Sequence, residues 1–199
     1  YIRVITLLKQ SDPILKYEVF NRLNTGGDKL LPQEIRNAAF EGDLNDLLVE
    51  LSENAFMRRQ LNISSEKNRL KSKVYREMLD VEYVLRFFTL RDSWENFPGN
   101  MRIAMDSFME KSYKSKDLNI VQLKQLFETT LEVCEIIWGE RAFKRPHGRN
   151  EMIQGIYDVQ TVSVSFFIDA KKDELIKNKI RIREQFEKLY FENKEFEIS

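Results

Sequence analysis

The residues that could perform chemistry are few and lie far apart. Cys134 and His147 are the only cysteine and histidine, and together they cannot supply the usual ligands of a zinc site. Cys134 falls on an apolar helical stripe, where a free cysteine is typically a small buried hydrophobe. A Ser-His-Asp triad would need His147, and the sequence has no GxSxG elbow. We therefore predict a buried Cys134, a solvated loop His147, no metal site and no catalytic residue in this chain.

A double glycine lies between two predicted helices, in the run LNTGGDKLLPQEIR over residues 23–36. Glycines before a helix N-terminus expose backbone amides that can hold an anion. The run matches neither GxGxxG nor GxxxxGK[ST], and it follows a helix instead of a strand. A left-handed C-cap explains Gly26 and Gly27 without a ligand. A tight corner is favoured from the residues alone, and a phosphate site remains the alternative.

Carboxylates crowd the same region, at Glu18, Asp28, Glu34 and Asp43. Paired carboxylates can transfer protons or hold magnesium. On helices they more often act as caps and solvated side chains, which is the interpretation we favour here.

Two segments are rich in cations. Residues 58–76 hold seven Lys/Arg against a single acidic residue, Glu66, and RAFKRPHGRN forms a basic loop at 141–150. Because the formal net charge of the chain is zero, solvated faces are the favoured interpretation. Clustered cations can nevertheless follow a phosphate backbone. The candidate nucleic-acid contacts are Arg58, Arg59, Lys67, Arg69, Lys71, Lys73, Arg141, Lys144, Arg145 and Arg149.

Helical periodicity dominates the elements that must position these residues. It predicts helices over 11–24, from Pro32 to near Gly42, and over 43–61, 74–91, 100–114, 119–140 and 171–192. The run VQTVSVSFF at 159–167 fits a strand or a helix, and we favour a helix because its neighbours are helical. Residues 1–8 alternate like a strand. The expected fold is mainly α, a helical bundle-like domain with a short N-terminal strand.

Composition limits the class of protein. The chain has 199 residues, of which 42% are hydrophobic and 32% charged, as in a helix-rich globular protein. One cysteine excludes an internal disulfide and favours a reducing compartment. We see no secretory signal and no apolar run long enough for a bilayer. A cytoplasmic location without membrane contact is expected.

Residues 12–51 resemble the prokaryotic family called domain of unknown function 262. Further similarity lies in EYVLRFFTLR at 82–91, MDSFMEKSY at 105–113 and WGERAF at 138–143. The family pattern matches Phe20, Arg22, Leu23, Asn24, Thr25, Gly26, Gly27, Leu31, Gln33, Glu34, Ile35, Arg36 and Asn37.

This resemblance implies a ParB/sulfiredoxin-like N-terminal half with an Asp-Gly-Gln-Gln-Arg motif linked to nucleotide hydrolysis, followed by a helical half. Relatives include the nucleotide-dependent subunit of type IV restriction enzymes and phage-defence proteins. The Asp-Gly-Gln-Gln-Arg motif and an HNH nuclease signature are absent here. The chain therefore resembles the later part of such a protein, with the end of the ParB-like domain at 1–42 and a helical domain at 43–199.

The resemblance transfers a nucleotide or phosphate site to the corner. Asn24 would orient the loop, the glycines would allow close approach, and Arg22 or Arg36 would meet a phosphate. The full set is Arg22, Asn24, Thr25, Gly26, Gly27, Gln33, Glu34, Arg36 and Asn37. No cofactor is expected in this chain, although a nucleoside triphosphate with magnesium would bind a longer parent protein, which could be an NTPase.

Two functions follow as expectations. The first is part of a nucleotide-dependent DNA-restriction or phage-defence protein, with the preceding ParB-like segment, DNA and a second copy as partners. It predicts that the corner and both basic segments share one surface. The second is a non-catalytic helical interaction or assembly module, which predicts an exposed apolar patch.

Overall fold

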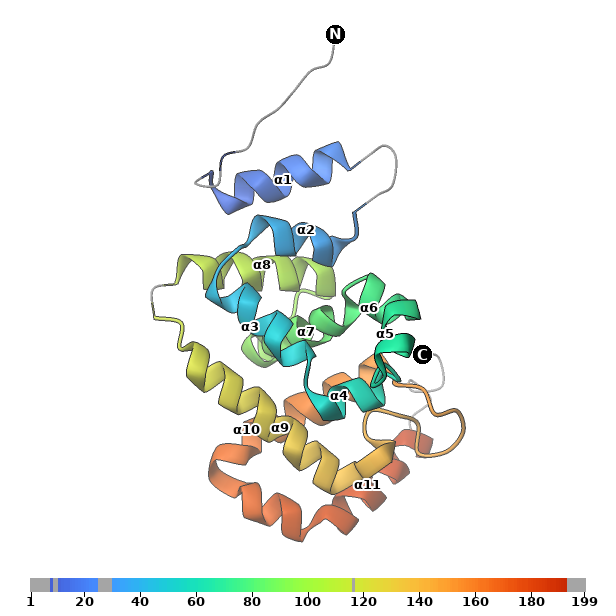
Figure 1. The fold of residues 1–199 in the computed structure, drawn as a ribbon. Coiled ribbons are helices and arrows are strands. Elements are labelled where there is room, and N and C mark those ends of the chain that lie inside the picture. The colour runs from blue at the N-terminus through green and yellow to red at the C-terminus, as the bar shows by residue number, and fades with distance from the viewer. Residues whose placement is uncertain (1–7, 9–10, 25–29, 116, 193–199) are drawn as a thin grey trace.

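The computed structural model describes residues 8, 11–24, 30–115 and 117–192, and this part of the chain is almost entirely helical (Figure 1). It contains no named strand, only an isolated antiparallel bridge between Lys144 and Met152. The mainly α prediction is confirmed, whereas the strand predicted over 1–8 lies outside the described residues except for Leu8. The helices are α1 (Pro13–Leu23), α2 (Pro32–Ala39), α3 (Asp43–Ser52), α4 (Ala55–Gln60), α5 (Glu66–Lys71), α6 (Lys73–Arg76), α7 (Leu79–Ser93), η1 (Trp94–Asn96), α8 (Met101–Lys114), α9 (Ile120–Trp138), η2 (Gly139–Arg141), α10 (Gln154–Lys177) and α11 (Lys179–Glu192).

The first two helices begin where the capping residues predict. The Asp12 carboxylate accepts a hydrogen bond from the Ile14 amide at 2.9 Å, and Pro13 opens α1. Pro32 opens α2, and the Glu34 carboxylate accepts one from the Leu31 amide at 2.6 Å.

The core forms where α7, α9 and α10 meet, with α3 against α7 and α9. Phe127 of α9 packs edge-on against Phe87 of α7, with ring centroids 5.2 Å apart. Tyr157 of α10 is fully buried and donates a hydrogen bond to the Tyr83 carbonyl at 3.0 Å. Burial of these aromatic side chains, together with the aliphatic residues of the same cluster, stabilises the core.

Three predicted helices are interrupted in the structure. The helix expected over 43–61 breaks at Asn54, whose side chain accepts hydrogen bonds from the first amides of α4. The helix over 74–91 is divided by Met78, in the left-handed region at φ 54°. The helix predicted over 171–192 is wrong as a single element, because it is interrupted at Asn178, whose side-chain amide donates to the Glu174 carbonyl at 2.8 Å. Its predicted start coincides with a kink in α10, where Lys171 has a non-helical backbone with φ −142° and ψ 24°. The helix favoured for 159–167 is confirmed as part of α10.

The division at residue 42 stays a prediction. Contacts cross it, because α2 packs against both α7 and α8. Among the described helices, none is both long and apolar enough to cross a bilayer.

Burial predicts the reactivity of the single thiol. Cys134 has no exposed surface, and burial raises the pKa of its thiol well above the ordinary value. In the native chain we expect Cys134 to react with a disulfide reagent roughly 100-fold more slowly than after denaturation in guanidinium, because attack requires the thiolate and access. Absorbance of the released thiolate measures the rate.

An exposed thiol on a neighbouring helix provides the control. Ser163 is exposed on α10, so Ser163→Cys should react at the denatured rate while Cys134 stays protected. Equal rates for native and denatured wild-type protein would contradict the buried assignment.

Candidate functional site

The corner between α1 and α2 is held by Asn24. Its side-chain amide donates to the Leu30 carbonyl at 2.6 Å, and its side-chain oxygen accepts from the Leu30 amide at 2.7 Å. One side chain therefore joins the two ends of the connection between the helices. Thr25, Gly26 and Gly27 lie outside the described residues, as does Asp28, so their predicted roles stay predictions.

Arg36 forms the centre of a buried ion-pair network. Its Nε donates to Asp106 of α8 at 2.7 Å, and its Nη1 lies 3.2 Å from both Glu82 of α7 and Gln33 of α2. Tyr17 of α1 donates its hydroxyl to the second Asp106 oxygen at 2.6 Å. Burial, followed by this bond to Asp106, raises the pKa of the Tyr17 phenol. The network therefore joins four helices.

These contacts give the corner residues structural roles. Arg36 has no exposed surface and already faces two carboxylates, so it does not offer a phosphate contact on the surface. Gln33 supports Arg36, Glu34 caps α2, and Asn37 accepts a hydrogen bond from Asn45 at 2.7 Å. The Arg22 side chain is 82% exposed, and its ion-pair partner Glu18 lies 3.9 Å away at the solvent-exposed surface. Arg22 is therefore accessible to a ligand, unlike Arg36.

Three arginines of the first basic segment pair with acidic side chains that lie outside the segment. Glu53 at the end of α3 pairs with both Arg58 and Arg69, and Arg59 pairs with Glu135 of α9. The local sequence count could not show this, because the partners lie outside the segment. Lys67 and Lys71 are exposed, and exposed Lys73 lies 3.6 Å from Glu77.

The second basic segment divides between surface and interior. Lys144 is only 2% exposed, and burial lowers the pKa of its ammonium, so the predicted surface contact there is not supported. Arg141 and Arg149 are exposed, whereas Arg145 is half-buried and donates to the Tyr190 hydroxyl at 3.1 Å.

The two basic segments meet at one place on the molecule. Arg59 lies 4.0 Å from Glu140, next to Arg141. In Figure 1, α1 and α2 lie at the top, α5 and α6 lie below them, and α4 lies in the lower half, beside the end of α9, so the meeting point of the two segments is far from the corner. This separation counts against a single DNA-binding face.

No catalytic arrangement forms around the single cysteine and histidine within the described residues. His147 is exposed and stacks on Phe191, with ring centroids 5.7 Å apart, whereas Cys134 is buried beside the Gln160 carbonyl. No group of three or more His, Cys, Asp or Glu in this part of the chain could hold a metal ion.

A large apolar groove, missed by the sequence analysis, lies between α9, α10 and α11. Its volume is about 560 Å³. Val159, Phe167 and Leu189 remain 44%, 49% and 59% exposed. The apolar lining comprises Ile137, Trp138, Val159, Val164, Phe167, Leu175, Ile182, Phe186 and Leu189. In the sequence, the signal for this surface is the helical spacing of apolar residues within 171–192.

Two lining residues carry hydrogen-bond donors without a partner among the described residues. These are the indole Nε1 of Trp138 and the amide Nε2 of Gln160. The Gln160 side chain is buried, and its oxygen accepts from the Phe143 amide at 2.8 Å. Both donor atoms are themselves buried, so neither is exposed to the groove.

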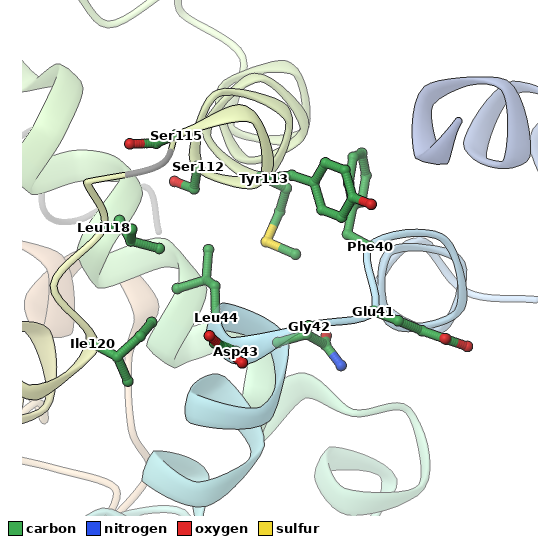
Figure 2. Close-up of a pocket in the computed structure, with 12 residues that line it drawn as sticks. Phe40, Glu41, Gly42, Asp43, Leu44, Ser112, Tyr113, Ser115, Leu118 and Ile120 are labelled. Carbon is green, nitrogen blue, oxygen red and sulfur yellow. The ribbon is translucent and has the colours of Figure 1, made fainter. Parts of the chain in front are cut away.

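A second cavity of about 300 Å³ lies where the α2–α3 turn meets the end of α8 (Figure 2). Leu44, Leu118 and Ile120 give it apolar walls, and Tyr113 and Asp43 contribute polar atoms. It does not include Arg36 or Asn24.

Comparisons with protein-family models, curated proteins and solved structures find no match to this chain.

Loss of the Arg36 guanidinium should strongly destabilise the fold. Arg36→Ala leaves Glu82 and Asp106 partly buried without their cation, for which we expect a loss of about 3–5 kcal/mol in the free energy of unfolding. Chemical denaturation followed by circular dichroism measures this loss.

Arg22→Ala is the matched control, because it removes an exposed arginine from the same corner and should change stability little. Similar stability losses in the two variants would contradict the central role of the Arg36 network.

Proposed function

We propose that this chain is a helical interaction module whose groove between α9, α10 and α11 binds an amphipathic helix of a protein partner. The observation that carries this proposal is the exposed apolar lining of the groove. An exposed patch of this kind was the feature expected of an interaction module.

The shape of the groove supports a helical occupant. Its walls are helices, and apolar grooves between helices commonly receive the apolar face of another helix. Phe167 and Val159 belong to α10 and Leu189 belongs to α11, so exposed apolar side chains from two helices line the groove. Desolvation of these side chains would supply the main binding free energy.

The charged residues of the lining indicate which kind of helix would bind in the groove. Lys171 and Arg181 lie on the lining with one carboxylate, Glu174, which is 4.0 Å from Lys171. The lining therefore carries a formal excess of one positive charge. This excess favours a helix bearing carboxylate side chains beside its apolar face.

Selection of helical peptides tests the proposal. From a displayed library of amphipathic helices, we expect binders whose affinity falls at least tenfold in Phe167→Ser, since this change removes an apolar wall. Titration calorimetry with a selected peptide measures the loss.

Phe166→Ser is the matched control, because Phe166 is 44% exposed but packs against Trp94, with ring centroids 5.9 Å apart. The control should retain affinity. Failure to select any groove-dependent peptide, or equal losses in both variants, would contradict the proposal. Analytical ultracentrifugation measures the oligomeric state. A wild-type dimer that becomes a monomer in Phe167→Ser would identify a second copy of the chain as the occupant.

A second candidate is part of a nucleotide-dependent DNA-restriction or phage-defence protein. The similarity of the corner motif favours it, as does Asn24, which joins the loop ends in the manner that a loop-orienting residue requires. The exposed Arg22 is the residue best placed to meet a phosphate in solution.

Calorimetry with ATP and GTP in the presence of magnesium tests this candidate. If the corner binds phosphate in this chain, Arg22→Ala should weaken nucleotide binding about tenfold without unfolding the protein. Arg102→Ala is the control. It removes an arginine of α8 whose side chain donates to Asn21 of α1, the helix that also carries Arg22. Absence of heat with either nucleotide would reject a phosphate site formed by this chain alone.

A further inference from the structure

We propose that the loop over residues 141–150 and the end of α11 form a binding site for single-stranded nucleic acid, in which arginines contact phosphates and two stacked rings contact bases. The residues concerned do not line the apolar groove and do not belong to the corner between α1 and α2. The inference therefore stands or fails independently of both proposed functions.

Two exposed rings stack on each other where the loop meets α11. His147 and Phe191 have ring centroids 5.7 Å apart, and their planes are inclined by 24°. Phe191 is nevertheless 60% exposed, and His147 is exposed as well. Tyr190 lies edge-on to Phe191, with ring centroids 5.5 Å apart. Because every nucleobase has a flat π-face, a base can extend this stack whatever its identity.

Hydrogen bonds hold the loop in place beside these rings. The Nε of Arg145 donates to the Tyr190 hydroxyl at 3.1 Å, which joins the loop to α11. The Nη1 of Arg141 donates to the Gly148 carbonyl at 3.4 Å, which joins the two sides of the loop. A site whose rings and cations are positioned before binding loses less conformational entropy when the ligand arrives.

The loop also carries an excess of positive charge. Residues 140–151 contain four Lys/Arg and two carboxylates, Glu140 and Glu151, so the formal excess is two. Arg141 and Arg149 are exposed, and neither forms an ion pair within the described part of the chain. Their guanidinium groups are therefore available to phosphate oxygens.

Lys144 indicates independently that an anion would be stabilised here. It is only 2% exposed and forms no ion pair with any described residue. Burial lowers the pKa of its ammonium, Glu140 opposes this change, and Arg141 adds to it. Lys144 and Arg141 therefore repel each other. A phosphate bound at the loop would offset this repulsion without touching the buried ammonium, because the electrostatic interaction acts at a distance.

A purely electrostatic site for any polyanion is the competing interpretation. Glu187 lies one helical turn before Phe191, and Glu192 follows Phe191 and lies 3.8 Å from Lys188. These carboxylates reduce the positive excess, so charge alone would hold a polyanion weakly. Stacking of one base on an aromatic ring typically changes affinity by roughly 10- to 100-fold. The bases should therefore decide whether a strand binds.

Fluorescence anisotropy with the full chain tests the inference. The probes are an oligothymidylate of about 15 nucleotides and an abasic strand of the same length. We expect oligothymidylate to bind saturably and at least tenfold more tightly than the abasic strand. Phe191→Leu and His147→Ala should each weaken oligothymidylate binding at least tenfold and leave abasic binding unchanged. Arg141→Gln combined with Arg149→Gln should weaken the binding of both probes.

A matched charge control separates this site from general attraction to the surface. Arg102→Gln combined with Lys114→Gln removes two exposed cations from α8, in the upper half of Figure 1, and should leave both affinities unchanged. Circular dichroism must show that every variant folds.

Four results would overturn the inference. They are equal affinity for the abasic strand, absence of saturation, retained oligothymidylate binding in either ring variant, and equal losses in the two charge variants. A ring variant that lost both affinities equally would show that the ring only shapes the loop, which would also overturn it.

Comparison of nucleic acids identifies the source of the strand. Oligouridylate that binds at least tenfold more tightly than oligothymidylate would assign the site to RNA, and equal affinities would assign it to single strands of either kind. Both results retain the site. A duplex that binds as tightly as its single strand would overturn the inference, because paired and stacked bases do not present their faces to the rings.

Discussion

The pairing of Arg36 with Asp106 and Glu82 is the interaction on which the N-terminal part of the structure depends. A guanidinium without exposed surface is tolerated only where carboxylates and hydrogen-bond acceptors replace water. Here the acceptors come from α2, α7 and α8, and Tyr17 of α1 joins through Asp106. Because each partner belongs to a different helix, the pairing fixes how α1 and α2 lie against the remaining bundle.

The same pairing changes the interpretation of the corner motif. Several residues for which the resemblance implied a phosphate site make structural contacts instead. Asn24 joins the two ends of the connection between α1 and α2, and Glu34 caps α2. A conspicuous arginine in a polar motif can therefore be the cation of an internal ion pair. Among the described arginines of the corner, Arg22 is the one with an exposed side chain.

Much of the fold could be predicted from local sequence, and the binding surfaces could not. Caps such as Asp12 and Pro32 act within one turn, so they mark helix starts reliably. Asn54 was missed as an internal cap because apolar spacing continued across it. The pairing of Arg58 with Glu53 and the burial of Lys144 depend on tertiary packing. Prediction of the groove would have required knowing that α11 packs against α9, and hydrophobic periodicity does not specify which helices pack together.

The zero net charge conceals surfaces of opposite character at the two ends of one helix. Ile120, at the start of α9, lines the second cavity, whose charged lining residues are Glu41 and Asp43. Ile137 and Trp138, at the other end of α9, line the groove, whose charged lining residues have a formal excess of one positive charge. At 1.5 Å per residue, the 18 steps from Ile120 to Trp138 span about 27 Å. Since α9 is an unbroken helix held by core contacts with α3 and α10, this separation is fixed.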